Sequence, residues 1–286
     1  MQYTHPENVD AAIADLASAA GLTRVLAGGT DLLVQLRAGI KEPEVVVDIK
    51  GIEETRTITR EGDGFLIGAA VAGSELGEHA DMCKTWPGIV EAVDLIGSTQ
   101  VQGRASMGGN LCNASPAADS VPAMIAADMI AHIVGPKGRR DVKVEDVCTA
   151  PGKTSLAKDE FIVSFSLAPR VPHSGDAYLR FIPRTEMDIA VAGVGINLTL
   201  DGAGTCTAAR VSIGAVAPTA LLVEDAGAAL VGTKVDDAAI EKMVAAVRAA
   251  CSPIDDKRGT IVYRIRVAGV LAERATRIAL DRAKES

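Results

Sequence analysis

Aromatic side chains are scarce in this chain. They make up only 3% of its 286 residues, with a single tryptophan, whereas apolar residues reach 48%. That apolar fraction is enough for packed cores, so disorder over most of the length is excluded. The cores must be built mainly from Ala, Val, Leu and Ile, and the length suggests about two domains.

Basic side chains are fewer than acidic side chains. The 29 Lys and Arg residues face 37 Asp and Glu residues, which gives a formal net charge of −8. Nucleic-acid binding depends on a basic face that attracts phosphate, so we expect no nucleic-acid partner. The sequence has no apolar run near the length of a bilayer span and no visible targeting segment. We therefore expect no membrane span and a cytoplasmic location.

Cysteines and histidines are few and scattered. No two of the five cysteines fall within three residues of each other; they are Cys83, Cys112, Cys148, Cys206 and Cys251. This spacing contains no zinc site, iron–sulfur cradle or redox pair, so we expect no metal ligands. No acid–base pair or nucleophile stands out either, and we predict no catalytic side chain in this chain.

The order of helix and strand patterns predicts an α+β fold. Residues 1–54 read as a helix capped by Asn8 and then strand, helix and strand. Residues 55–176 read as a hairpin around Gly62–Gly64, a helix near 87–96 and three further strands, with an unusually long irregular segment at 97–119. Residues 177–286 read as an antiparallel strand pair followed by amphipathic helices. We place the domain boundary near residue 176, in a Pro- and Gly-containing stretch.

Two glycine loops carry the strongest chemical signal. The first is Ala27-Gly28-Gly29-Thr30-Asp31-Leu32, between a predicted strand and helix, and the second is Ser106-Met107-Gly108-Gly109-Asn110. Paired glycines let backbone N–H groups turn toward one point and let a bulky anion approach closely. Two such loops could hold a diphosphate from both sides, although a single Gly-Gly pair is more often only a tight turn.

Two competing glycine motifs are incomplete. Gly193-Val194-Gly195 lacks the third glycine of a dinucleotide fingerprint and lies in a strand pattern. Gly152-Lys153-Thr154 resembles the end of a P-loop, but Val147 occupies the place of its first glycine. We interpret both as structural.

Further motifs follow the two loops in order: Ala114-Ser115-Pro116 with Asp119, Tyr178-Leu179-Arg180-Phe181 with Arg184 and Asp188-Ile189-Ala190, and Asp256-Lys257-Arg258-Gly259 with Tyr263-Arg264. Over its whole length the sequence resembles the FAD-binding medium subunit of molybdenum hydroxylases. This family includes aerobic carbon monoxide dehydrogenase and the separate-subunit relatives of xanthine dehydrogenase. The resemblance implies a PCMH-type FAD-binding domain of two subdomains over 1–176 and a C-terminal domain over 177–286.

The resemblance also implies a role for particular residues. Residues of the two glycine loops would bind the FAD pyrophosphate mainly through backbone N–H groups. They are Ala27, Gly28, Gly29, Thr30, Asp31 and Leu32 in the first loop, and Ser106, Gly108, Gly109 and Asn110 in the second. Asp119 would take a sugar or ribityl hydroxyl, and Ile162 would touch the flavin plane. Arg180 stands where many relatives have Lys, near the flavin ring, and its permanent charge would stabilise anionic reduced flavin.

Some positions keep two interpretations. Asp31 could contact a ligand or only compensate a helix dipole. Asn110 and Asn113 could bond the flavin or satisfy loop backbone, and Asn110 is the better candidate. Arg184 and Asp188 could order a loop over the flavin or form a surface pair.

The sequence also departs from the family pattern. Gln102 and Gly103 stand where relatives often have Arg and Asn, so phosphate or partner contacts there are in doubt. The cysteine-bearing insertion of members with an extra iron–sulfur cluster is also missing.

The implied function is electron transfer within an oxidoreductase. The chain would take electrons from a small [2Fe–2S] subunit, which a large molybdenum-cofactor subunit feeds, and would pass them through FAD to an external acceptor. The whole would form a dimer of such heterotrimers. Two alternatives are a self-sufficient FAD-dependent oxidase or reductase with its own substrate site, and a scaffold whose ligand site has decayed. The substrate and the final acceptor are not encoded in this chain.

Overall fold

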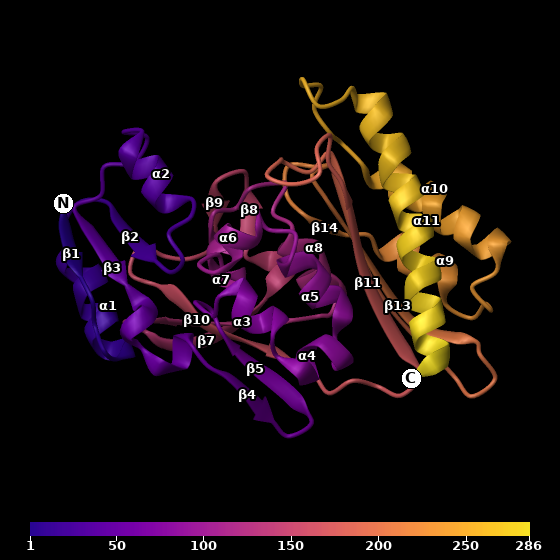
Figure 1. Ribbon diagram of the computed structural model, residues 1–286, viewed down its shortest axis with the longest axis horizontal. Helices are drawn as coiled ribbons and strands as arrows, with labels where there is room; N and C mark the ends of the chain where they lie inside the picture. The colour runs from indigo at the N-terminus through magenta and orange to yellow at the C-terminus, as the bar shows by residue number, and fades with distance from the viewer.

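Three structural units follow one another along the chain, each around its own hydrophobic core. The computed structural model describes residues 1–286. The N-terminal unit, the middle unit and the C-terminal unit lie in a row, with the middle unit between the other two (Figure 1). Mixed helices and strands in these units confirm the predicted α+β class.

The N-terminal unit is a small parallel sheet with strand order β1-β3-β2. Its strands are β1 (Gln2–Thr4), β2 (Thr23–Leu26) and β3 (Val45–Asp48). Helix α1 (Val9–Ser18) packs on β3 and is capped by Asn8, whose Oδ1 accepts a hydrogen bond from Ala11 N at 2.9 Å, as predicted. Helix α2 (Leu32–Arg37) follows the first glycine loop and buries none of its residues.

The middle unit is built on an antiparallel sheet with strand order β4-β5-β10-β6-β7. These strands are β4 (Ile58–Glu61), β5 (Gly64–Gly68), β6 (Ile130–Gly135), β7 (Gly138–Lys143) and β10 (Phe161–Leu167). A small hairpin pairs β8 (Cys148–Ala150) with β9 (Lys153–Thr154). Short 3-10 turns occupy Ile49–Gly51, Glu53–Thr55 and Val144–Asp146.

Six helices cover the middle sheet: α3 (Gly73–Gly77), α4 (Ala80–Thr85), α5 (Pro87–Val93), α6 (Thr99–Gln102), α7 (Met107–Cys112) and α8 (Ser120–Ala126). The prediction of a long irregular segment at 97–119 is wrong in part, because α6 and α7 lie within it. Each has about one turn, which is too short for an apolar period to show in the sequence.

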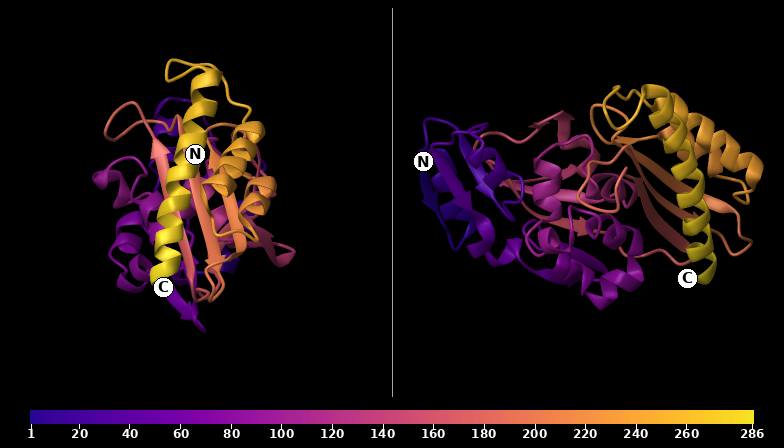
Figure 2. Two further views of the ribbon diagram at one scale, coloured as in Figure 1. Left: turned by 90° about the vertical axis from the view of Figure 1, so that its right-hand side faces the viewer. Right: turned by 45° about the horizontal axis from the view of Figure 1, so that its top comes forward.

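The C-terminal unit is an antiparallel sheet with strand order β11-β12-β13-β14. Its strands are β11 (Ser174–Phe181), β12 (Ala192–Leu200), β13 (Cys206–Gly214) and β14 (Leu221–Leu222). Helices α9 (Glu224–Leu230), α10 (Asp237–Ala250) and α11 (Ile261–Glu285) cover its outer face (Figure 2), and α5 and α8 of the middle unit pack on its inner strands. None of the helices combines the length and apolar character needed to cross a membrane. The boundary near residue 176 remains a prediction; Asp176 is the third residue of β11.

A buried polar network fixes the C-terminal unit against α5. Asp176 accepts a hydrogen bond from Gly88 N at 2.9 Å and forms an ion pair with Arg170 at 3.1 Å. Arg282 on α11 donates to the backbone oxygen of Asp176 at 2.7 Å and pairs with Glu91 on α5. Because both units contribute charges to this network, we infer that it holds them in one orientation.

The contact between β11 and α11 leaves no room for a side chain at Gly175. A Cβ at this position would stand 1.9 Å from the backbone oxygen of Ala279. We expect Gly175→Ala to lower the free energy of unfolding by about 1–3 kcal/mol, measured by urea denaturation, because the helix must shift. Gly202→Ala, in the open β12–β13 turn, is the control and should leave the midpoint unchanged. Equal stability of the two variants would contradict the packing described.

Candidate functional site

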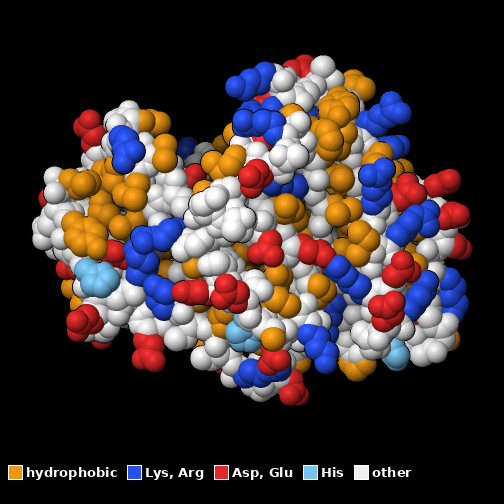
Figure 3. All heavy atoms as spheres, in the orientation of Figure 1, with side chains coloured by type: hydrophobic (Ala, Val, Ile, Leu, Met, Phe, Trp, Pro, Cys, Tyr) orange, Lys and Arg blue, Asp and Glu red, His pale blue; other side chains and the backbone are white.

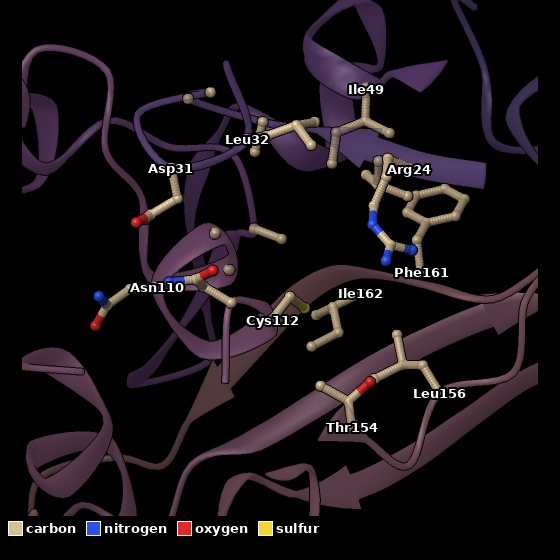
Figure 4. A pocket seen from close by; sticks show the side chains of 18 of the residues that line it. Arg24, Asp31, Leu32, Ile49, Asn110, Cys112, Thr154, Leu156, Phe161 and Ile162 are labelled. Atoms are coloured by element: carbon tan, nitrogen blue, oxygen red, sulfur yellow. The ribbon is translucent and has the colours of Figure 1, made fainter. Parts of the chain in front are cut away.

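A cavity of about 580 Å³ lies between the N-terminal and middle units. Its wall is formed by the first glycine loop, by α7 and by the start of β10 (Figure 4). The two glycine loops, separated by more than seventy residues in sequence, therefore face the same space. Eleven of the predicted site residues line it: Ala27, Gly28, Gly29, Thr30, Asp31, Leu32, Ser106, Gly108, Gly109, Asn110 and Ile162.

The first glycine loop is fixed in place at both of its glycines. Gly29 has a φ of +79°, which an L side chain rarely adopts. A Cβ on Gly28 would stand 1.8 Å from the backbone oxygen of Arg104, in the segment that leads to α7. Lys50 Nζ donates to the backbone oxygen of Ala27 at 2.9 Å and anchors the loop to β3 through Asp48.

A row of backbone donors in this loop has no partner within the protein. The N–H groups of Gly28, Gly29, Thr30 and Asp31 donate none of the hydrogen bonds that the chain makes internally. All four residues line the cavity; Gly28 is buried, Gly29 and Thr30 are half-buried, and Asp31 is exposed. The first N–H groups of a helix lack intrahelical partners, and successive unpaired N–H groups form a concavity that attracts anions.

The second glycine loop differs from the first, because the N–H groups of its two glycines already donate hydrogen bonds within the protein. It forms the first turn of α7, in which Gly108 N donates to Ala69 O at 3.2 Å and Gly109 N donates to Ser106 Oγ at 3.2 Å. A Cβ on Gly109 would meet only Ser106 Oγ within 4 Å. The backbone donors that the sequence led us to expect from both loops therefore come mainly from the first, and α7 contributes a surface that a ligand can approach closely.

Asn110 and Asp31 both face the cavity (Figure 4). The N–H and Oγ of Ser120 donate to Asn110 Oδ1 at 3.1 and 2.7 Å, so the side-chain NH₂ group of Asn110 is the part left for a ligand. The side chain of Asp31 makes no capping bond to α2, and burial raises its pKa. Asn113 instead accepts a hydrogen bond from Gln35 at 3.0 Å.

Asp119 and Arg180 lie outside this cavity and bind each other. Arg180 Nη1 donates to Asp119 Oδ2 at 2.6 Å, and the hydroxyl of Tyr178 donates to Asp119 Oδ1 at 3.3 Å. Burial raises the pKa of Asp119 to about 6, against the opposing effect of the Arg180 guanidinium. The structure thus joins α8 to β11 through a buried ion pair.

Arg180 also lines a second hollow, of about 470 Å³, between the middle and C-terminal units. Its Nε is buried and has no hydrogen-bond partner within the protein, which is unusual for a buried donor. Gln102 lines the same hollow, whereas Gly103 lines neither space. The structure therefore does not bring Ile162 and Arg180 into one cavity.

Sequence reasoning missed several residues of the main cavity. Arg24 on β2 points into it beside Phe161 (Figure 4), and burial lowers its pKa. Thr154, the last residue of β9, and Leu156, which follows the small hairpin, also line the cavity (Figure 4). Arg24 could have been predicted from the sequence, because it is a basic residue on the strand that leads into the first glycine loop. No local sequence pattern marks the hairpin residues as part of the site.

The loop at 182–190 is tied down by charges. Asp188 accepts from Arg184 Nε and from Arg258 Nε, both at 3.1 Å, so the predicted pair is part of a three-residue cluster. Arg264 is buried and donates to Val191 O at 2.9 Å, which holds the C-terminal unit together. Across the chain, no group of three or more His, Cys, Asp or Glu side chains is arranged to hold a metal ion.

Two family matches cover most of the chain: one spans the N-terminal and middle units, and the other spans most of the C-terminal unit. Residues 1–170 match the FAD binding domain in molybdopterin dehydrogenase, and residues 177–279 match the CO dehydrogenase flavoprotein C-terminal domain. The first match contains the whole main cavity, and the second contains Arg180 and the charged loop that follows it.

Whole-chain relatives agree with these matches. The carbon monoxide dehydrogenase medium chain of Afipia carboxidovorans is 32% identical over 283 residues, which cover 99% of this chain and 97% of the relative. The putative xanthine dehydrogenase FAD-binding subunit of Escherichia coli strain K12 is 35% identical over 205 residues, covering 71% of this chain and 70% of the relative. The structure of carbon monoxide dehydrogenase from Hydrogenophaga pseudoflava superposes with a TM-score of 0.94 at 31% identity, covering 99% of this chain and 98% of the other.

These similarities extend over the full length and include both spaces described above. They confirm the resemblance predicted from the ordered motifs and the predicted cofactor, FAD. The chain belongs to the FAD-binding medium subunits of the molybdenum hydroxylase family.

Proposed function

We propose that this chain holds FAD across its two spaces and transfers electrons within a molybdenum hydroxylase. The observation that carries the proposal is the row of unpaired N–H groups from Gly28 to Asp31, which faces the glycine surface of α7 across one cavity. A diphosphate supplies the acceptors that these donors lack, and the two glycines of α7 allow it to approach. The residues present therefore fit a dinucleotide.

The orientation of the cofactor follows from the two ends of the site. The main cavity ends in an apolar wall that includes Phe161 and Ile162, with Arg24 beside it, and this wall suits adenine. The free Nε of Arg180 suits a ring that becomes anionic on reduction. We therefore place the flavin ring toward Arg180 and Asp119, and assign Ile162 to the adenine end rather than to the flavin plane.

The cofactor would carry out the electron transfer, and the residues of this chain would bind and orient the cofactor. Bound FAD supplies the ability to accept and release electrons. The first loop and Asn110 would bind the diphosphate. Asp119 would accept a hydrogen bond from a hydroxyl of the sugar or ribityl chain, and Arg180 would place a fixed positive charge at the flavin ring. This division of labour requires no nucleophile or acid–base pair for substrate chemistry in this chain.

The proposed partners follow from the family. We assign the electron donor to a small [2Fe–2S] subunit and substrate oxidation to a large molybdenum-cofactor subunit, with an external acceptor as the destination and a cytoplasmic dimer of heterotrimers as the assembly. Support comes from relatives described as medium chains and FAD-binding subunits of dehydrogenases.

The proposal is tested by the flavin content of the purified assembly. We expect characteristic flavin absorption bands at one FAD per copy of this chain, and bleaching of these bands when the donor subunit is reduced. Absence of flavin after incubation with FAD would refute the cofactor assignment. Steady turnover of a small substrate by this chain alone would instead support a self-sufficient flavin enzyme.

Gly109 allows a test that separates binding from folding. Its missing side chain would project into the cavity, so we expect Gly109→Val to raise the Kd for FAD at least thirtyfold, or about 2 kcal/mol. Gly103→Val is the matched control, because a Cβ there would lie outside the cavity and would meet only Gln100 O, at an ordinary contact distance of 3.7 Å. Fluorescence titration measures affinity, and circular dichroism checks the fold. Unchanged affinity in Gly109→Val would count against the diphosphate position.

Arg180 allows a test of the flavin-ring position. Removing its charge in Arg180→Met should lower the flavin midpoint potential by about 30–60 mV, because a charge-assisted hydrogen bond worth about 1.5–3 kcal/mol to the reduced ring is lost. Arg180→Lys keeps the charge and should shift the potential by less than half as much. A dye-equilibrated titration measures both variants. Identical shifts would show that the charge of Arg180 does not act on the ring.

A further inference from the structure

A hydrogen bond that the proposed function does not use reaches Asp119 from β11. The hydroxyl of Tyr178 donates to Asp119 Oδ1 at 3.3 Å, while Arg180 Nη1 donates to the other carboxylate oxygen at 2.6 Å. Tyr178 is 2% exposed, and burial and the nearby carboxylate raise its pKa well above the usual range. The phenol therefore stays protonated and acts as a donor to Asp119.

Two glycines on one face of the C-terminal sheet make room for this hydrogen bond. Across the ladder between β11 and β12, Gly195 lies opposite Tyr178 and Gly193 lies opposite Arg180. A Cβ on Gly193 would stand 2.6 Å from the Tyr178 hydroxyl, and one on Gly195 would stand 2.5 Å from the backbone oxygen of Pro122 in α8. The Gly193-Val194-Gly195 motif therefore lets the start of α8 and the phenol approach each other.

The cluster of Tyr178, Asp119 and Arg180 is shielded from water, unlike the ion pairs at the surface. Acidic and basic side chains lie next to one another over the outer face of the molecule (Figure 3), where water screens them and a pair contributes little. The side chains of Arg180 and Asp119 are only 4% and 10% exposed. A change of charge on either of them therefore acts strongly on its neighbours.

The other charged groups around this cluster are paired or line the hollow. Glu91 of α5 accepts a hydrogen bond from Tyr178 N at 3.1 Å, but it is paired with Arg282 of α11. Three acidic side chains line the hollow together with Arg180: Glu78, Asp94 and Glu186. Burial raises the pKa of Asp119 to about 6, whereas Arg180 and the Tyr178 hydrogen bond both act to lower it. Arg180 and Tyr178 are therefore the groups that keep Asp119 charged at neutral pH.

We propose that Tyr178 is a positioning residue of the flavin site, which acts on the ring through Asp119 and Arg180. Its hydroxyl keeps the carboxylate charged and fixed against the guanidinium, so that the carboxylate offsets part of the positive charge at the ring. The inference rests on the proposed function, which places the flavin ring beside Arg180. It adds the residue that sets how strongly this charge acts.

The first test measures the midpoint potential of bound FAD in the full assembly. Tyr178→Phe keeps the buried ring and removes only the hydroxyl, so the pKa of Asp119 should rise and its carboxyl should become neutral near neutral pH. The charge of Arg180 is then less compensated, and we expect flavin reduction to become about tenfold more favourable, or about 30 mV more positive for a two-electron couple. Tyr263→Phe removes a phenol from a side chain that is 41% exposed and is the control, which should leave the potential unchanged.

A second measurement does not depend on the cofactor. Infrared difference spectra of the FAD-free chain, recorded along a pH titration, report protonated carboxyl groups, and Asp119→Asn identifies the band that belongs to Asp119. We expect Tyr178→Phe to move the midpoint of this band upward by about one pH unit, which is about a tenfold change in the acid dissociation constant. An unchanged midpoint would show that the hydroxyl does not act on Asp119.

Other results would also overturn the proposal. An unchanged potential in Tyr178→Phe, or one that falls as expected for Arg180→Met, would exclude an effect through the charge of Asp119. In the Arg180→Met background, Tyr178→Phe should cause no further shift, and additive shifts would show that the two residues act independently. Absence of FAD from the wild-type assembly would refute the proposed function first, whereas bound FAD with an unaltered potential in Tyr178→Phe would remove only the role of Tyr178.

Discussion

The function of this chain depends on a short row of backbone N–H groups that the fold leaves without partners. Gly28 packs against the backbone of Arg104, and Gly29 has a positive φ. Lys50 donates a hydrogen bond to the backbone oxygen of Ala27 at the start of the loop. These restraints prevent the loop from closing on itself and satisfying its own donors. Because unpaired donors are costly, the arrangement favours a ligand that supplies several acceptor oxygens, and a diphosphate does so without requiring a basic side chain at each contact. A chain with net charge −8 can bind such a ligand in this way.

The sequence was most informative where a signal is local or periodic. The long strands, α10, α11 and the Asn8 cap follow from apolar patterning and capping chemistry, and the two glycine loops stand out by composition. It was least informative where structure depends on distant contacts. The short helices α6 and α7 show no period, and the engagement of Gly108 N by Ala69 O depends on packing between segments forty residues apart. The separation of Ile162 from Arg180 follows from the stacking of three units, which no local pattern encodes.

Both spaces of the site lie at seams between units rather than inside one core. The main cavity separates the N-terminal and middle units, and the hollow at Arg180 separates the middle and C-terminal units. Cores built largely from small aliphatic side chains pack densely and leave little internal volume, so an extended ligand is accommodated where cores meet. The seam between the middle and C-terminal units is closed by polar contacts, including the pair Arg180–Asp119 and the network around Asp176.

This arrangement links cofactor binding to the relative placement of the units. Asp119 and Arg180 come from different units, and their ion pair is buried with one guanidinium donor left free. Breaking such a pair is costly, because it leaves an uncompensated charge in a medium of low dielectric constant. The same strand, β11, carries both Arg180 and Asp176, so one strand positions the ion pair with Asp119 and the network that joins the C-terminal unit to α5.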